Sequence, residues 1–275
     1  MPRLIRQALN AAGVRDPARA ATGVDVIGDI AIVRLEELTT RERQKVAKQL
    51  LASLKNVKVV MEQEGGIEGE FRLRSLRHLA GVRRTLTLHR ENGCSFRVDV
   101  AKCYFSPRLS TERLRVASLV GGDERVLNMF AGVGPYSVEI AKLSGARVVS
   151  CELNGYAAGL HLENDRINKV EDRIEVVNCD AKELPSRYGK EFDRILMPHP
   201  SGADAFLPTA LELARPGATI HYYRHVLGRD EGEASGALHS ELGSLVPPRT
   251  KHSTRMVREV GPRWVELCAD IRTPG

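Results

Sequence analysis

Apolar and polar residues alternate with the period of a β-strand in two parts of the first hundred residues. One alternating run covers residues 24–35 and is interrupted at Gly28. Two further runs, residues 85–89 and 95–100, flank the step Asn92-Gly93. An Asn-Gly step between two alternating runs predicts a tight β-hairpin turn. We therefore expect strands in both parts and a hairpin around this step.

Between these strands the pattern changes to the period of a helix. Thr39 and Glu42 form a capping box, and apolar residues follow at four-residue spacing: Val46, Leu50 and Leu54. Residues 57–61 read as the next strand, and the first twenty residues predict a short helix followed by a loose segment. Residues 1–105 are thus expected to form a small α+β domain.

After residue 125, apolar strand-like runs alternate with helical segments. The runs are residues 126–130, 147–152, 174–178, 193–197 and 218–225. This rhythm predicts a doubly wound, mostly parallel sheet. Two last runs flank Gly261-Pro262 and predict a closing antiparallel hairpin. We expect this α/β domain to span residues 106–275.

Three strand ends of the α/β domain carry residues suited to a nucleoside ligand. The strand 126–130 runs into Gly132 and Gly134, which allow a tight turn and close approach of a ligand to the backbone. Glu152 ends the next strand, about twenty residues on, where an acid accepts hydrogen bonds from ribose hydroxyls. Asp180 ends the third strand and is placed to reach an adenine amino group.

The glycine turn lacks one part of the dinucleotide fingerprint. That fingerprint has a third glycine where this chain has Ser137, and Pro135 also interrupts it. A pyrophosphate ligand is therefore disfavoured. S-adenosylmethionine fits better, because it presents adenine, ribose and a zwitterionic tail but no phosphate. The alternative is that the two glycines form an ordinary strand-to-helix turn.

Composition narrows the class of partner. The 275-residue chain is 42% hydrophobic and has a formal net charge of +6, which is compatible with an RNA partner. The five cysteines form no CxxC pair, so we expect reduced thiols, no metal site and a cytoplasmic location. Neither a membrane-spanning run nor a signal-peptide core is expected.

Five segments together resemble the archaeal and eukaryotic type of tRNA (guanine-37) N1-methyltransferase. They are residues 104–115, 128–136, 152–154, 163–170 and 221–223. The resemblance implies a class I (Rossmann-like) methyltransferase fold, with a mostly parallel sheet and an antiparallel C-terminal hairpin, preceded by a smaller α+β domain that recognises RNA. It also implies methyl transfer from S-adenosylmethionine to N1 of guanosine 37, beside the anticodon, by a monomer that binds the anticodon stem-loop of tRNA.

The same resemblance assigns site residues. Glu112 matches the family's proposed general base, and Arg72 is the counterpart expected to stabilise charge on guanine O6. The expected cofactor contacts are Arg108, Arg113, Phe130, Ala131, Gly132, Gly134, Glu152, Leu153, Asp180, Ala181 and Pro198. The alternatives are structural. Glu112 and Arg113 would belong to a solvated helix start, Arg72 would contact phosphates with its basic neighbours, and Asp180 would cap a helix.

The chain departs from the family pattern at two strand ends. Asn128 stands where the first strand usually ends in an acid, and Pro198-His199-Pro200 replaces an Asn-x-Pro motif. We expect backbone carbonyls held by the prolines to take over substrate binding, with His199 adding a hydrogen bond or accepting the proton. A lone loop histidine is otherwise simply exposed. The chain is also expected to lack an extra N-terminal domain found in many relatives.

Three rival functions remain at this stage. One is the wyosine-pathway transfer of an aminocarboxypropyl group to modified tRNA guanosine, against which the Arg108 segment argues. A second is methylation of a wyosine-precursor guanosine, which the altered Pro198-His199-Pro200 loop would accommodate. The third is a non-catalytic RNA-binding protein, in which Asn128 and Pro198 mark lost catalysis.

Overall fold

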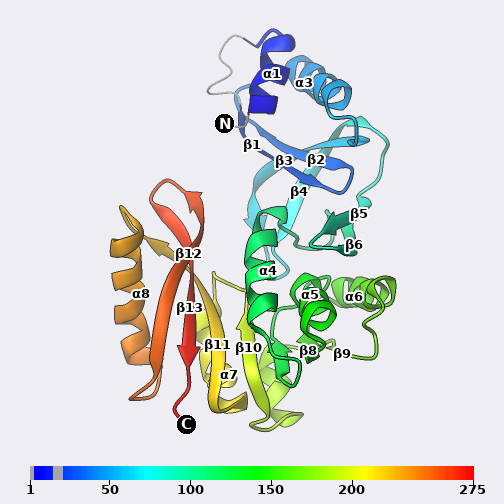
Figure 1. Cartoon of the computed structure of the whole chain (residues 1–275). Helices are drawn as coiled ribbons and strands as arrows, with labels where there is room; N and C mark the ends of the chain where they lie inside the picture. Colours follow the sequence, from blue (N-terminus) through cyan, green and yellow to red (C-terminus); the bar gives the residue numbers. More distant parts are fainter. Residues whose placement is uncertain (1–2, 15–20) are drawn as a thin grey trace. The chain divides into compact units, whose positions relative to one another are not determined.

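The computed structural model describes residues 3–14 and 21–275, and the chain divides into two compact units, Met1–Ser110 and Thr111–Gly275 (Figure 1). The sequence placed the boundary after residue 105, whereas the units separate after Ser110. Much of the loose segment expected before the first strand lies outside the described residues. Among the helices that the structure describes, none is both long enough and apolar enough to cross a membrane.

In its described residues, the first unit combines the α-helices α1 (Arg3–Ala11) and α3 (Thr40–Ser53), the short helix η1 (Pro107–Leu109), a four-stranded sheet and a separate hairpin. Its strands are β1 (Ala21–Ile27), β2 (Ile30–Leu35), β3 (Val59–Glu68), β4 (Leu73–Gly81), β5 (Leu86–Glu91) and β6 (Cys94–Asp99). The sheet order is β1-β2-β3-β4, with only β2 and β3 parallel, and β5 pairs with β6. Side chains of α1 and α3 pack with those of the sheet in one apolar core.

Local signals in this unit have the predicted effect. The capping box is present, because Thr39 Oγ1 accepts from the Glu42 amide at 3.3 Å and Glu42 Oε2 accepts from the Thr39 amide at 2.9 Å. Asn92 and Gly93 both have positive φ, 47° and 72°, as a two-residue hairpin turn requires. The capping box and the hairpin are confirmed.

Two features of this unit go beyond what the sequence predicts. Residues 24–35 form two strands rather than one, because the chain reverses at Gly28, whose φ is 55°. The basic run after Arg72 is strand β4, which the sequence analysis did not predict. Its Arg74 is buried and pairs with Asp25 at 3.3 Å, and Arg77 pairs with Glu62 at 2.8 Å. Part of this run is therefore engaged within the protein.

The second unit contains a seven-stranded sheet of order β12-β13-β11-β10-β7-β8-β9. The strands are β7 (Arg125–Asn128), β8 (Arg147–Cys151), β9 (Ile174–Val177), β10 (Phe192–Met197), β11 (Ala214–Leu227), β12 (Lys251–Gly261) and β13 (Trp264–Arg272). The helices are α4 (Ser110–Leu119), α5 (Pro135–Ser144), α6 (Gly155–Asn168), η2 (Ala181–Ser186), η3 (Ala203–Phe206), α7 (Leu207–Leu213) and α8 (Glu231–Leu245). Strands β9, β8, β7, β10 and β11 run parallel, and β13 is antiparallel to both β11 and β12. The expected α/β fold with its terminal hairpin is confirmed.

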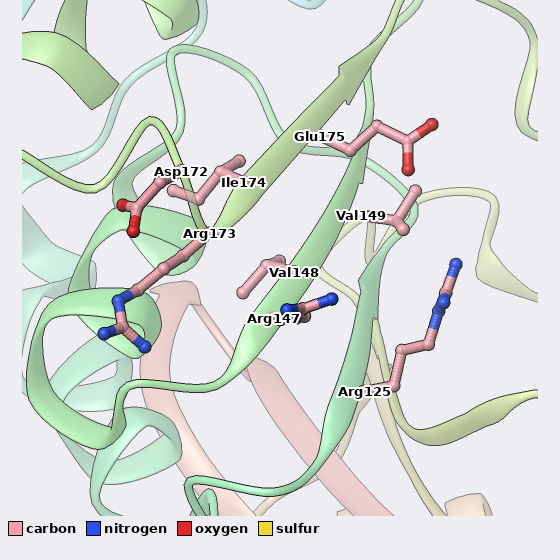
Figure 2. Close-up of a pocket in the computed structure, with 8 residues that line it drawn as sticks. All are labelled: Arg125, Arg147, Val148, Val149, Asp172, Arg173, Ile174 and Glu175. Atoms are coloured by element: carbon pink, nitrogen blue, oxygen red, sulfur yellow. The ribbon is translucent and has the colours of Figure 1, made fainter.

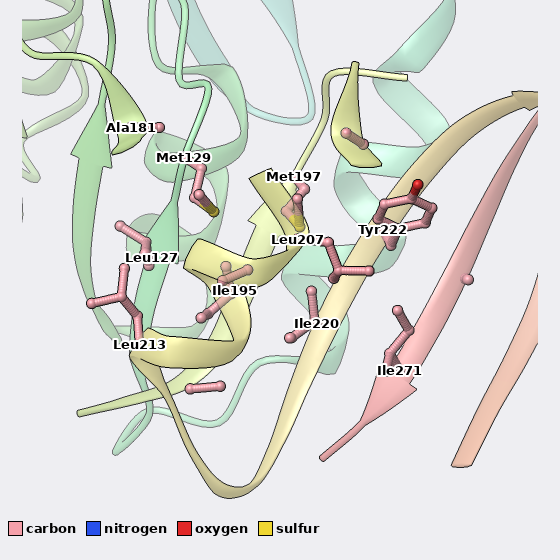
Figure 3. Packing of buried hydrophobic residues seen from close by; sticks show 14 of the residues in the cluster. Leu127, Met129, Ala181, Ile195, Met197, Leu207, Leu213, Ile220, Tyr222 and Ile271 are labelled. Carbon is pink, nitrogen blue, oxygen red and sulfur yellow. The ribbon is translucent and has the colours of Figure 1, made fainter. Parts of the chain in front are cut away.

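One face of this sheet carries the main apolar core (Figure 3). Leu207 and Leu213 of α7 pack there against strand residues such as Ile195 and Ile220, all fully buried. Each such side chain contributes about 1.5–3 kcal/mol by leaving water. Because successive strand residues point to opposite faces, Leu196 and His221 face away from this core. That second face carries the polar groups described below.

Candidate functional site

The glycine turn joins the end of β7 to the start of α5. Gly132 and Gly134 have φ of 57° and 89°, a region that L-residues with a Cβ rarely adopt. Gly134 has a second constraint, because a Cβ there would lie 2.2 Å from Cδ2 of the buried His161 on α6. The turn is thus both left-handed and packed tightly against the helix behind it.

Glu152 lies just after β8 and is bonded to the glycine turn. Its Oε2 accepts from the Gly132 amide at 2.6 Å, and its Oε1 accepts from the Asn154 amide at 2.8 Å. Burial raises the pKa of Glu152, although these backbone donors oppose the rise. The carboxylate therefore belongs to the strand end where a ribose was expected.

Asp180 follows β9 and caps the short helix η2. Its side chain accepts from the Lys182 amide at 2.9 Å. Helix capping, the alternative raised from the sequence, is thus present, and the adenine contact stays a prediction. The neighbouring Ala181 is buried, whereas Leu153 beside Glu152 is 40% exposed.

Aromatic side chains gather at the carboxyl ends of β7 and β10. Phe130 lies 5.0 Å from His199 and 4.9 Å from Phe206 between ring centroids. The His199 amide bonds to the Met197 carbonyl at 2.7 Å across Pro198, which makes a tight turn after β10. Ligands of open parallel sheets bind at such carboxyl ends, where the strand order reverses, and here it reverses between β7 and β10.

Glu112 is buried and accepts four hydrogen bonds. Its Oε1 accepts from Tyr223 Oη and Arg115 Nη2, both at 2.7 Å. Its Oε2 accepts from Arg115 Nε at 2.9 Å and Arg255 Nη1 at 2.6 Å. Only 4% of Glu112 is exposed, so the interpretation of a solvated helix start is wrong. Two guanidinium groups, those of Arg115 and Arg255, therefore orient the carboxylate.

A pair of phenols connects Glu112 to the glycine turn. Tyr136, in the first turn of α5, donates to Tyr223 at 3.3 Å, and Tyr223 donates to Glu112. Burial raises the pKa of both phenols, so both keep their protons at neutral pH. The expected general base and the expected cofactor turn are therefore parts of one hydrogen-bonded assembly.

Three arginines and Asn128 have surroundings that the sequence did not reveal. Arg108 pairs with Asp25 at 2.7 Å, Arg72 lies over the Tyr104 ring at 5.0 Å, and Arg113 is 2% exposed with Glu139 at 3.6 Å. Asn128 is fully buried and donates to Ser137 at 3.0 Å. The cofactor and substrate roles of these arginines stay predictions.

A pocket of about 280 Å³ lies at the amino ends of β7, β8 and β9 (Figure 2). It is lined by Arg125, Arg147, Val148, Val149, Asp172, Arg173, Ile174 and Glu175. Arg125 already pairs with Glu191 at 2.8 Å. The pocket thus mixes charges and lies at the end of these strands opposite the glycine turn.

The structure brings together, at the carboxyl ends, Phe130, Ala131, Gly132, Gly134, Glu152, Leu153, Asp180, Ala181, Pro198 and His199. Sequence reasoning missed the partners of Glu112. Arg115, three residues along the same helix, was visible in the sequence. Tyr223 and Arg255 depend on strand register and gave no local signal.

Fold and site together define a Rossmann-like domain built to bind a nucleoside-containing cofactor beside a buried carboxylate. Residues 87–232 match the model described as the TRM5/TYW2 methyltransferase domain, and residues 6–85 match that of the TYW2 N-terminal domain. The chain belongs to the TRM5/TYW2 methyltransferase family.

Individual relatives agree with this membership. The chain is 37% identical to the tRNA (guanine(37)-N(1))-methyltransferase Trm5b of Pyrococcus abyssi, over 91% of this chain and 74% of the relative. It is 31% identical to the tRNA 4-demethylwyosine(37)-methyltransferase Taw21 of Saccharolobus solfataricus, over 90% of this chain and 93% of the relative. The structure of Methanocaldococcus jannaschii Trm5 in complex with adenosine superposes with a TM-score of 0.79, at 30% identity over 100% of this chain and 79% of that one.

Proposed function

We propose that the protein transfers a methyl group from S-adenosylmethionine to N1 of guanosine 37 in tRNA. The observation that carries the proposal is Glu112, a buried carboxylate hydrogen-bonded through Tyr223 to Tyr136 of α5, the helix that follows the glycine turn, in a chain 37% identical to a Trm5b enzyme. Guanine N1 carries a weakly acidic proton that must leave as the methyl group arrives, and a positioned carboxylate accepts it.

The residues present fit the cofactor. The left-handed glycines expose backbone at Gly132, and Glu152, which is half-buried, presents its carboxylate to the same place. We assign the ribose to Glu152, the adenine to the loop at Asp180 and the ring of Phe130, and the methionine tail to the glycine turn. When bound, S-adenosylmethionine supplies an electrophilic methyl group on a sulfonium.

Proton transfer to Glu112 requires that one of its four hydrogen bonds be released. Arg255 is the donor best suited to leave, because its side chain is 45% exposed, whereas that of Arg115 is 20% exposed and Tyr223 is buried. Release of Arg255 frees Oε2 to accept the N1 proton while Arg115 and Tyr223 still orient the carboxylate. We retain Arg72 as the arginine that stabilises charge on guanine O6, and His199 as a contact to the target guanine.

A second candidate reaction is methylation of a 4-demethylwyosine at position 37. Two observations favour it: this chain covers 93% of a Taw21 methyltransferase of that specificity, and Pro198-His199-Pro200 replaces the motif expected for guanosine. Both reactions use the same cofactor, and Glu112 occupies the same position in the site for both.

The test is a methylation assay on two tRNA substrates, one with guanosine 37 and one with 4-demethylwyosine 37, read by mass spectrometry of the nucleosides. We expect a methyl increment on guanosine that Glu112→Gln lowers by about 10²–10⁴-fold in kcat. Glu171→Gln, a change at an exposed residue, serves as the control and is expected to keep full activity. An aminocarboxypropyl increment, or a methyl increment on 4-demethylwyosine alone, would contradict the proposal.

We further propose that the enzyme acts in the cytoplasm as a monomer. All five cysteines are free and buried, as in a reducing compartment. The four donors to Glu112 come from the same chain, so a second copy is not needed to complete this part of the site.

A further inference from the structure

The register of the last three strands aligns polar side chains beneath α4. Across β11 and β13, His221 pairs with Asp270 and Tyr223 pairs with Cys268, while Arg255 of β12 pairs with Cys268 on the other side. The two-residue period places all five on one face of the sheet. The Arg115 side chain of α4 reaches this face and contacts both Asp270 and Cys268.

A chain of contacts runs from Glu112 into this row. Arg115 holds Glu112 with Nε and Nη2, and its Nη1 donates to Asp270 Oδ2 at 3.0 Å. Asp270 Oδ1 then pairs with His221 Nδ1 at 2.6 Å, and His221 Nε2 lies 2.9 Å from Arg194 Nη1. Charge alternates from Glu112 through Arg115 to Asp270, and His221 then lies between Asp270 and Arg194.

The far end of this chain is anchored to the backbone. Arg194 donates to the Leu119 carbonyl, at the end of α4, at 2.9 Å and to Glu124 at 2.6 and 2.9 Å. His221 is fully buried between Arg194 and Asp270, so its Nδ1–H donates to Asp270 and its Nε2 accepts from Arg194, as a neutral imidazole does. The helix that carries Glu112 is thus held at both ends by the same set of contacts.

Titration properties agree with this arrangement. Burial lowers the pKa of His221 more than Asp270 raises it, so the ring stays neutral. Burial alone would raise the pKa of Asp270, but His221 and Arg115 outweigh it and hold that pKa well below its usual range. Asp270 is therefore an anion that orients Arg115 across the working pH range.

The same row contains a set of possible metal ligands, His221, Cys268 and Asp270. A cation is disfavoured there because Arg194 already occupies His221 Nε2 and Arg115 lies 3.0 Å from Asp270 and 3.6 Å from Cys268. A divalent ion would have to displace one of two guanidinium groups. The row is better explained as a support for Glu112.

We propose that Asp270, backed by His221 and Arg194, is a positioning residue that fixes Arg115 and through it the carboxylate of Glu112. This inference rests on the proposed function, in which Glu112 accepts the N1 proton. None of the three need touch the substrate. They act on the orientation of the Glu112 carboxylate, and the rate of proton transfer is sensitive to that orientation.

The test is a double-mutant cycle with Asp270→Asn and Glu112→Ala. Asp270→Asn alone is expected to lower kcat by about 10-fold to 100-fold with the KM for S-adenosylmethionine unchanged. In the Glu112→Ala background the same change is expected to have no further effect, because the group it positions is gone. Asp204→Asn, which removes a surface ion pair of the same 3.0 Å length with Arg224, is the control and should keep full kcat.

The outcomes separate this inference from the proposed function. If Glu112→Ala retains full activity, Glu112 is not the base and the proposed mechanism fails. If Glu112→Ala lowers kcat to a residual rate, and Asp270→Asn lowers kcat by the same factor in both backgrounds or in neither, the positioning role is wrong. Should Asp270→Asn fail to fold, Arg115→Lys, which keeps the charge but loses the forked contact, tests the same coupling in the same cycle.

Discussion

His161 and Asp165 on α6 are two ionisable side chains enclosed behind the glycine turn. They are 0% and 1% exposed, and His161 Nε2 lies 3.3 Å from Asp165 Oδ1. Burial lowers the pKa of His161 to about 3 and raises that of Asp165 to about 8. At neutral pH the pair therefore consists of a neutral imidazole and a protonated carboxyl, so no charge lies behind Gly134.

Asp165 makes stability depend on pH in a direction opposite to most carboxylates. Its pKa is about 8 in the folded state against an ordinary value of 3.8, so the folded state binds this proton more tightly. The stability it contributes is complete below about pH 4 and is lost as the pH rises toward 8. Asp165→Asn keeps a neutral side chain at every pH. We expect the Tm of the variant to rise relative to wild type between pH 5 and pH 9.

Thermal unfolding of both proteins at pH 5, 7 and 9 measures this difference. The titration of His161 is common to both proteins, so it cancels in the comparison. A Tm difference that stays constant across the range would show that Asp165 is ionised in the folded protein.

Two glycines near the junction of β7, α5 and α6 differ in whether a side chain would fit at their position. Gly134 has φ of 89° and a Cβ position 2.2 Å from His161, whereas Gly159, in the middle of α6, is exposed with open space around its Cβ position. Gly134→Ala combines backbone strain with a clash, and we expect it to cost about 2–4 kcal/mol and to weaken cofactor binding. Gly159→Ala should instead stabilise by about 0.5–1 kcal/mol.

Urea unfolding of the two variants, with calorimetric titration of S-adenosylmethionine, gives both quantities. The pair is matched, since each change adds one methyl group close to the same helix. Equal stability of the two variants would mean that α6 moves away from the turn without cost.

The sequence predicts an element well when the residues that specify it are neighbours along the chain. The parallel strands, the terminal hairpin and the turn at Gly132 were predicted, because alternation and glycine placement are local properties. Strand β4 was missed, since charged residues such as Arg77 alternate with its apolar ones and are held by acids of β3. The surroundings of Glu112 were missed because Tyr223 and Arg255 meet it only through the register of β11, β12 and β13.

The net charge of +6 gives the whole protein an attraction for tRNA that does not depend on base sequence. Several basic residues of the first unit are committed to internal ion pairs, among them Arg74 and Arg84. Arg83, just after β4, is exposed. Contacts to tRNA phosphates should therefore come from exposed basic residues such as Arg83. The dependence of tRNA affinity on salt concentration gives the number of these contacts.

We expect Arg83→Ala to raise the KM for tRNA and to reduce the slope of log KM against log salt by about 1, with kcat and the KM for S-adenosylmethionine unchanged. The physical reason is that one fewer phosphate releases its counterion on binding. Arg229→Ala is the matched control, because it removes the same charge from a side chain that is 77% exposed but pairs with Glu233 at 3.0 Å. Steady-state kinetics at four or more salt concentrations measure both slopes. If the slope changes equally in the two variants, it reports only the total charge of the protein. If it changes in Arg83→Ala alone, Arg83 contacts a phosphate, just after the end of β4.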